Sequence, residues 1–152
     1  MYKLDRGFVI PSAAYTIPRK VIKGYVPIER PPQVGDLLYG KVMTLGQHNS
    51  LENSQGRIHT IHQGTKAVFV FGNRYAPDYY EGLIPTNSEF TEVDLLARSG
   101  VVGSVISRSG KVISPTSIIP LGYICDSEGN VLNSRNFNSV IPKQNTKKFP
   151  RA

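Results

Sequence analysis

Short stretches rich in apolar, β-branched and aromatic residues recur along the chain, and they predict strands. The main stretches are five to nine residues long, and in residues 57–62 polar and apolar residues alternate. Glycine, asparagine, aspartate or proline bounds most of them. The expected strands are residues 37–45, 57–62, 65–71, 81–85, 101–107 and 118–125, with short hairpin partners at 111–113 and 131–133.

One segment has a helical spacing of apolar residues instead. Between residues 88 and 100 the apolar positions fall on one helical face, Ser88 suits the N-cap, and Gly100 suits the position after the last turn. The pattern predicts one short helix of roughly ten residues. The chain is therefore expected to be mostly β, with strands on both sides of that helix.

The two ends of the chain differ from the middle. Five prolines between residues 11 and 32 leave no room for a long helix or a central strand, so residues 1–33 are expected to form a proline-rich arm that packs on the body or on a partner. The last residues, 142–152, are polar and basic and are expected to be disordered. A β domain with a C-terminal hairpin, residues 34–141, lies between them.

The net charge of +7 belongs to the ends. Residues 1–32 carry six basic and two acidic side chains, and residues 135–152 carry five basic side chains and no acid. The intervening residues have a net charge of −2. Basic ends suit contact with a polyanion, because each cation placed on a phosphate releases counterions. The alternative is that the charge serves solubility alone.

Several classes of protein are disfavoured by what the sequence lacks. The single cysteine, Cys125, excludes an internal disulfide, and its apolar neighbours favour a buried side chain over a reactive thiol. No apolar run is long enough to span a membrane and no secretory signal is evident, so a cytoplasmic location, or a nuclear one, is expected. No nucleotide-binding or nucleophile motif is present, and His59 and His62 point to opposite faces of a strand. We therefore expect no enzyme activity, no cofactor and no metal.

Four segments in order resemble the S1 type of OB-fold domain. A Gly-Asp turn precedes a strand that reads Leu-Leu-Tyr-Gly-Lys-Val, and an apolar strand, a Glu-Gly-Leu segment and a later glycine-rich strand follow. These pieces span about half of the chain and lie at residues 34–42, 67–70, 81–85 and 100–107. The resemblance implies an OB/S1-like β-barrel, whose helix lies between the third and fourth strands.

The resemblance also implies a surface for single-stranded nucleic acid, RNA above all, on the first three strands. Such surfaces stack bases on aromatic rings beside cations that follow the phosphate backbone. By position it points to Lys41, Phe69 and Phe71; Arg57, His59, Arg74 and Tyr75 lie close by in the sequence and complete the candidate set. For Phe69 and Phe71 a place in the core is the competing interpretation.

The expected function is a non-catalytic module that binds single-stranded nucleic acid within a larger assembly. The alternative is a protein-interaction or structural subunit whose arms wrap neighbouring chains. A small hydrolase would need polar groups converging from distant loops, which the sequence does not indicate.

Overall fold

The computed structural model describes residues 1–74, 80–108 and 114–137. This part of the chain is mostly β, as the pattern predicts, with three short 3₁₀-helices. The strands are β1 (Gly24–Val26), β2 (Leu37–Thr44), β3 (Ser50–Glu52), β4 (Ile58–Thr60), β5 (Lys66–Phe71), β6 (Tyr80–Leu83), β7 (Val93–Leu95), β8 (Val101–Arg108) and β9 (Ser117–Cys125). The helices are η1 (Ser12–Ala14), η2 (Arg19–Val21) and η3 (Ser134–Phe137).

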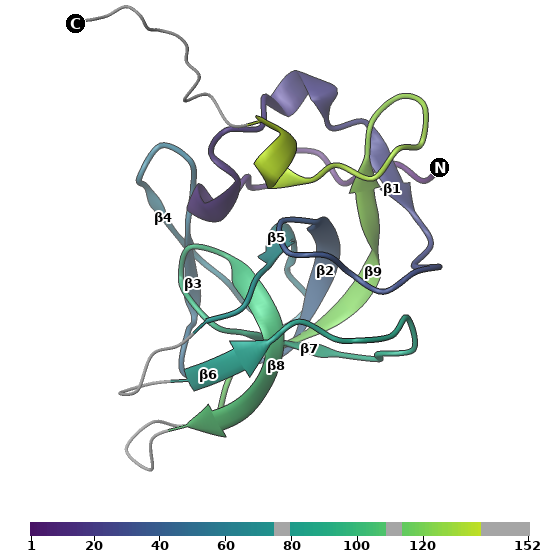
Figure 1. Cartoon of the computed structure of the whole chain (residues 1–152). Helices are drawn as coiled ribbons and strands as arrows, with labels where there is room; N and C mark the ends of the chain where they lie inside the picture. Colours follow the sequence, from purple (N-terminus) through teal and green to yellow (C-terminus); the bar gives the residue numbers. More distant parts are fainter. Residues whose placement is uncertain (75–79, 109–113, 138–152) are drawn as a thin grey trace, which may run out of the picture.

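Five strands close in a ring (Figure 1). β2 pairs with β5 and β9, β7 joins β9 to β8, and β8 returns to β5. The β5–β8 pair is parallel, and the other four pairs are antiparallel. β1 extends the sheet beyond β9, and β6 pairs with the end of β8 that leaves the ring. β3 and β4 form a separate hairpin beside the ring.

The helix predicted between residues 88 and 100 is absent, and that prediction is wrong. The chain there is extended and contains β7, whose Val93 and Leu95 are buried while Asp94 between them is half-buried. The Asp94 carboxylate accepts a hydrogen bond from the Val105 backbone N–H at 2.9 Å. Pairing with both β8 and β9 closes the ring, and this tertiary gain outweighs a weak local preference for a helix.

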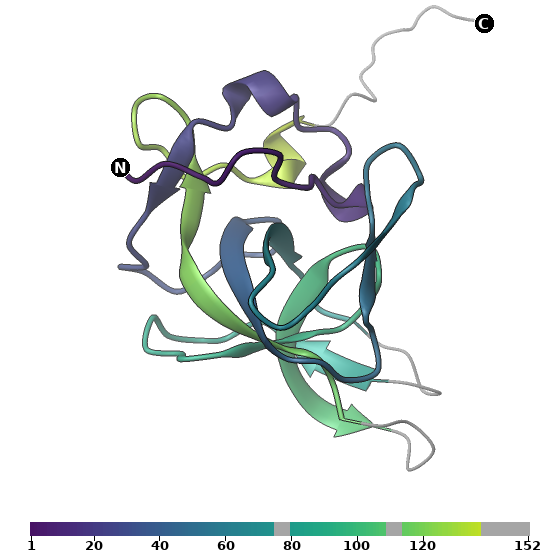
Figure 2. The same cartoon turned by 180° about the vertical axis from the view of Figure 1, so that it is seen from behind.

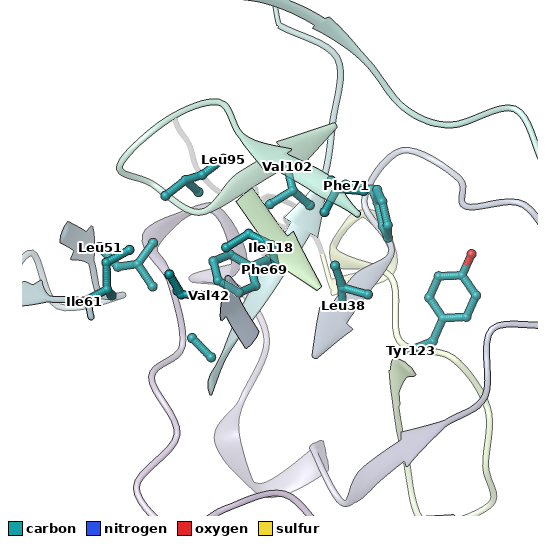
Figure 3. Packing of buried hydrophobic residues seen from close by; sticks show 12 residues of the cluster. Leu38, Val42, Leu51, Ile61, Phe69, Phe71, Leu95, Val102, Ile118 and Tyr123 are labelled. Carbon is teal, nitrogen blue, oxygen red and sulfur yellow. The ribbon is translucent and has the colours of Figure 1, made fainter. Parts of the chain in front are cut away.

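The interior of the ring is an apolar cluster. Alternate residues of β2 and β5 point inward, so Leu38 and Val42 meet Phe69 and Phe71. Figure 3 shows Phe69 beside Ile118 at the centre of this cluster. A methyl group at Gly40 would overlap with the Ile118 side chain and lie only 3.2 Å from the Phe69 ring, which is why a glycine serves in the middle of β2.

The N-terminal segment, residues 1–26, packs on the body, one of the two outcomes expected for the arm. Leu37, Tyr39, Val68 and Val70, on the outward face of β2 and β5, form a second cluster with apolar residues of the segment. The segment contributes Ile10, Ala14, Ile17 and Ile22, each no more than 7% exposed. Figures 1 and 2 show this segment, which contains η1 and η2, crossing one end of the ring beside η3.

Among the described residues, no helix has the length and apolarity that a membrane span requires. The C-terminal tail expected to be disordered, residues 142–152, lies outside the described part of the chain, as do the hairpin partner at 111–113 and Tyr75. In place of the strand expected at 131–133 the chain makes isolated bridges, one from Val131 to Cys125 and one from Asn133 to Asp36.

Candidate nucleic-acid interface

Phe69 and Phe71 do not lie on a surface. Both are 0% exposed, and the ring of Phe71 makes edge-to-face contacts with Phe90 and Tyr123, with centroids 5.7 and 6.2 Å apart. The period of two along β5 turns both rings into the interior. Their assignment as stacking platforms is therefore corrected, and the competing interpretation, a place in the core, is confirmed.

The outward face of the same strands is largely covered. Tyr39 and Val68 face away from the ring but are buried under the N-terminal segment. The segment is also tied there by hydrogen bonds, since the Asp5 backbone N–H donates to the Tyr39 hydroxyl at 3.2 Å. A nucleic acid cannot reach this part of β2 and β5 while the segment is in place.

Lys41 lies beyond the covered part of β2 and is exposed. It stands directly opposite Lys66 of β5, whose ammonium lies 3.7 Å from the Asp5 carboxylate. Lys41 therefore stays available for a phosphate, but no described aromatic side chain on the outer face of β2 or β5 lies exposed beside it.

The remaining candidate binding residues do not share one hollow. His59 lines a cleft beside the N-terminal segment, Arg74 lines a hollow beside β6, and Lys41 lines a third near Ile119. Arg57 is exposed on the turn that leads into β4. The structure therefore brings Arg57 and His59 onto one hairpin and places Lys41 and Arg74 elsewhere.

The cleft at His59 lies between the N-terminal segment and the β3–β4 hairpin and has a volume of about 270 Å³. Its two walls are held together, because the Ser54 backbone N–H donates to the Ile10 carbonyl at 2.9 Å and Pro11 bridges Asn53. None of the described side chains that line it is a carboxylate. The lining residues are Gly7, Phe8, Val9, Ile10, Ile17 and Arg19 on one side and Asn53, Ser54, Gln55 and His59 on the other.

Arg19 gives the cleft a planar cation. Its guanidinium carbon lies over the Phe8 ring, 4.2 Å from the centroid, and one of its nitrogens donates to the Phe8 carbonyl. The two contacts hold the guanidinium of an otherwise exposed side chain against the Phe8 ring. The sequence gives no local signal for this pair, because eleven residues separate the two and a 3₁₀ turn brings them together.

Asn53 fixes the tautomer of His59. The Asn53 amide oxygen accepts backbone N–H bonds from Gln55 and Arg57, both 2.9 Å, so its nitrogen is the atom 3.0 Å from His59 Nε2. That nitrogen can only donate, and Nε2 must therefore accept. The proton of the neutral imidazole is then on Nδ1, which is left as a donor.

A second group of cations lies near His48. The pKa of His48 is lowered, and burial is the largest cause. The charges of Arg74 and Arg98 lower this pKa further, whereas a hydrogen bond with the Leu96 backbone raises it. The histidine is therefore neutral at pH 7 and belongs to the packed loop rather than to an exposed binding surface. Arg74, by contrast, is half-buried beside β6.

The sequence analysis also weighed a reactive cysteine and a metal site. Cys125 is 0% exposed, and burial raises the pKa of its thiol, which confirms the buried interpretation. In the parts of the chain that the structure describes, no group of three or more histidine, cysteine, aspartate or glutamate side chains is placed to hold a metal ion.

Comparisons with protein-family models, with curated proteins and with solved structures found no match for this chain.

Proposed function

We propose that this protein is a non-catalytic module that binds single-stranded nucleic acid, RNA above all, at the cleft between its N-terminal segment and the β3–β4 hairpin. The observation that carries the proposal is the composition of this cleft. A guanidinium that lies over an aromatic ring lines the same cleft as an imidazole and two amides, and no described lining side chain is acidic.

Each part of the cleft suits one part of a nucleotide. Bases of single strands stack on aromatic rings and on guanidinium planes, and amide side chains bond to base edges. Cations around the opening hold the phosphates. Arg6 and Lys20 of the N-terminal segment and Arg57 of the hairpin are exposed and can serve this purpose.

The packing of the ring also favours the cleft over the face of the sheet as the binding site. The ring buries the aromatic residues of β5, and the N-terminal segment covers the outward face of β2 and β5. The resemblance to an OB/S1 domain implies a nucleic-acid surface on the first three strands. Our proposal keeps the ligand class that the resemblance implies and moves the contact to the edge of the covering segment.

Fluorescence anisotropy with labelled single-stranded RNA and DNA tests the proposal. We expect binding to the full chain that weakens steeply as salt rises. Replacing Arg57 and His59 together by alanine is expected to weaken binding at least about tenfold, since each stacked base or charged contact contributes about 1–3 kcal/mol.

Lys23→Ala is the matched control, because Lys23 is exposed on the N-terminal segment but does not line the cleft. An equal loss from this control would reduce the interaction to general attraction between charges. Absence of binding at low salt would refute the proposed function.

A second candidate, protein interaction, is favoured by the β6–β8 ribbon. Leu83 and Ile106 are 50% and 62% exposed and line one hollow of about 350 Å³ beside an edge strand. Edge strands with exposed apolar residues pair readily with another chain. The version in which N-terminal arms wrap neighbours has less support, because the apolar residues of this segment are buried in their own chain.

Sedimentation velocity over a range of concentrations tests this second candidate for self-association through the ribbon. Dimers that Leu83→Asp abolishes would support it. A monomer at every concentration would count against pairing of β6 with a second copy.

A further inference from the structure

We infer that the cleft holds one unstacked nucleobase, with the base lying on the Arg19 guanidinium and its edge facing the β3–β4 hairpin. This inference rests on the proposed function and deepens it. It assigns the recognition of a base to a planar contact and to two polar side chains, His59 and Gln55, and it assigns the remaining cations to the phosphates.

The planar contact follows from the position of Arg19. The guanidinium carbon lies over the Phe8 ring, 4.2 Å from its centroid, and the bond to the Phe8 carbonyl helps to hold the group there. Since both residues line the cleft, the opposite face of the guanidinium is the flat surface that a base can cover. The layers would then be ring, guanidinium and base, an order that combines cation–π attraction with base stacking.

The edge contacts follow from the hairpin. His59 offers its Nδ1–H as a donor, because the bond from Asn53 occupies Nε2. Gln55, beside it on the lining, carries an amide that both donates and accepts. A base edge presents donors and acceptors side by side, and this pair of side chains can match it.

The size of the cleft limits the occupant to one base. Its volume of about 270 Å³ lies just below the usual range for small-molecule sites, about 300–1,000 Å³. A base within a duplex cannot enter such a pocket unless it is flipped out, and flipping costs a few kcal/mol. The cleft therefore selects single-stranded or terminal nucleotides over paired ones.

The decisive variant is Arg19→Lys, compared with Arg19→Ala. Lysine keeps the charge but has no plane on which a base can stack. We would follow the amide signals of Gly7, Gln55 and His59 in the full chain by NMR while adding adenosine, uridine, their 5′-monophosphates or inorganic phosphate. Nucleosides and nucleotides are expected to shift these signals, and inorganic phosphate is not.

Both Arg19 variants are expected to weaken nucleoside binding about tenfold or more, because a stacked base contributes that much. Lys23→Ala, an exposed cation of the same segment outside the lining, is the control and is expected to bind as the parent does. Gln55→Ala is a second variant, which removes an edge contact from an exposed turn and leaves the Arg19–Phe8 pair intact. It is expected to weaken nucleoside binding severalfold.

An Arg19→Lys variant that binds nucleosides like the parent would overturn the inference, as would shifts reproduced by inorganic phosphate alone. The failure of this inference differs from the failure of the proposed function. If salt-sensitive strand binding persists in Arg19→Lys, the proposed function stands and the base pocket fails. If nucleosides bind but long strands bind no more tightly than one nucleotide, the pocket stands and the proposed function fails.

Discussion

The two apolar clusters on either side of the β2–β5 pair are built by different means. The inner cluster, inside the ring, is made by alternate residues of regular strands, with Phe69 and Ile118 at its centre. The outer cluster is made by the N-terminal segment with its two 3₁₀ turns, which lays Ile10, Ala14 and Ile17 on the outward face of the same strands.

The difference separates stability from function. Both aromatic residues of β5, Phe69 and Phe71, are buried in the inner cluster, so neither can contact a ligand. The outer cluster covers the sheet face but ends beside the β3–β4 hairpin, where Phe8 and Arg19 reach the surface. The cleft is therefore a product of how the N-terminal segment packs, and the ring acts as its support.

The largest effect is expected from Phe69→Ala. Emptying the centre of the inner cluster should destabilise the fold by about 3–5 kcal/mol, because the surrounding strands cannot close the cavity. Denaturant unfolding followed by circular dichroism measures it. Tyr15→Ala, an aromatic residue that is 64% exposed, is the control, with a change below about 1 kcal/mol. A Phe69→Ala variant that keeps its stability but loses nucleic-acid binding would reverse the correction made above.

A somewhat smaller effect is expected from Ile17→Ala in the outer cluster. Ile17 is 3% exposed, and its loss should cost about 2–4 kcal/mol. Hydrogen exchange should locate the loss in residues 8–22, while β2 and β5 keep their protection. Ile58→Ala removes the same atoms from a side chain that is 53% exposed and should cost little. Uniform loss of protection across the ring would show that the two clusters form one cooperative unit.

Asp36→Asn tests the contacts at one end of the ring. The buried Asp36 carboxylate accepts from Arg30 and the Gln33 backbone on one oxygen, both 2.8 Å, and from Asn133 at 3.0 Å on the other. An amide places an N–H group against one of these donors, which should cost about 1–3 kcal/mol. Asp5→Asn, whose ion pair is exposed, should change stability by less than about 1 kcal/mol. Equal unfolding midpoints for the two variants would contradict this.

The smallest effect is expected from His48. Because burial and nearby arginines lower its pKa in the folded state, the unfolded state takes up a proton first as the pH falls. The stability that His48 contributes is fully present above about pH 6.5, and it is lost as the pH falls through the pKa of His48 in the folded state. Unfolding midpoints measured from pH 7.5 to 5 should fall less in His48→Gln than in the parent, whereas exposed His62→Gln should follow the parent. An unchanged pH dependence in His48→Gln would contradict the assignment.

Much of the fold could be predicted from the sequence, because the strands carry their signal locally. β2, β5, β6 and β9 lie within or close to the expected ranges, since apolar and β-branched residues and flanking turns mark them. β7 was missed. Its residues fit a helix as well as a strand over so short a stretch, and only pairing with β8 and β9 decides between the two.

The candidate site could be predicted only in part. Arg57 and His59 were among the candidates because they lie close in the sequence to the strands of the resemblance, but Phe8 and Arg19 have no signal that distinguishes them from other residues of the N-terminal segment. Their pairing depends on how a segment without regular structure packs on the sheet. The direction in which Phe69 and Phe71 point depends on which face of β5 is interior, and two apolar faces leave that open until both clusters are known.

The most direct test of the account compares two charge reversals side by side, Arg19→Glu in the cleft and Lys41→Glu on the uncovered end of β2. Both residues are exposed and both changes alter the net charge by two, so general attraction to a polyanion falls equally. We expect that Arg19→Glu abolishes most of the anisotropy change with single-stranded RNA and that Lys41→Glu causes only a modest loss. Loss of binding in Lys41→Glu with binding retained in Arg19→Glu would place the contact on the sheet and contradict the account.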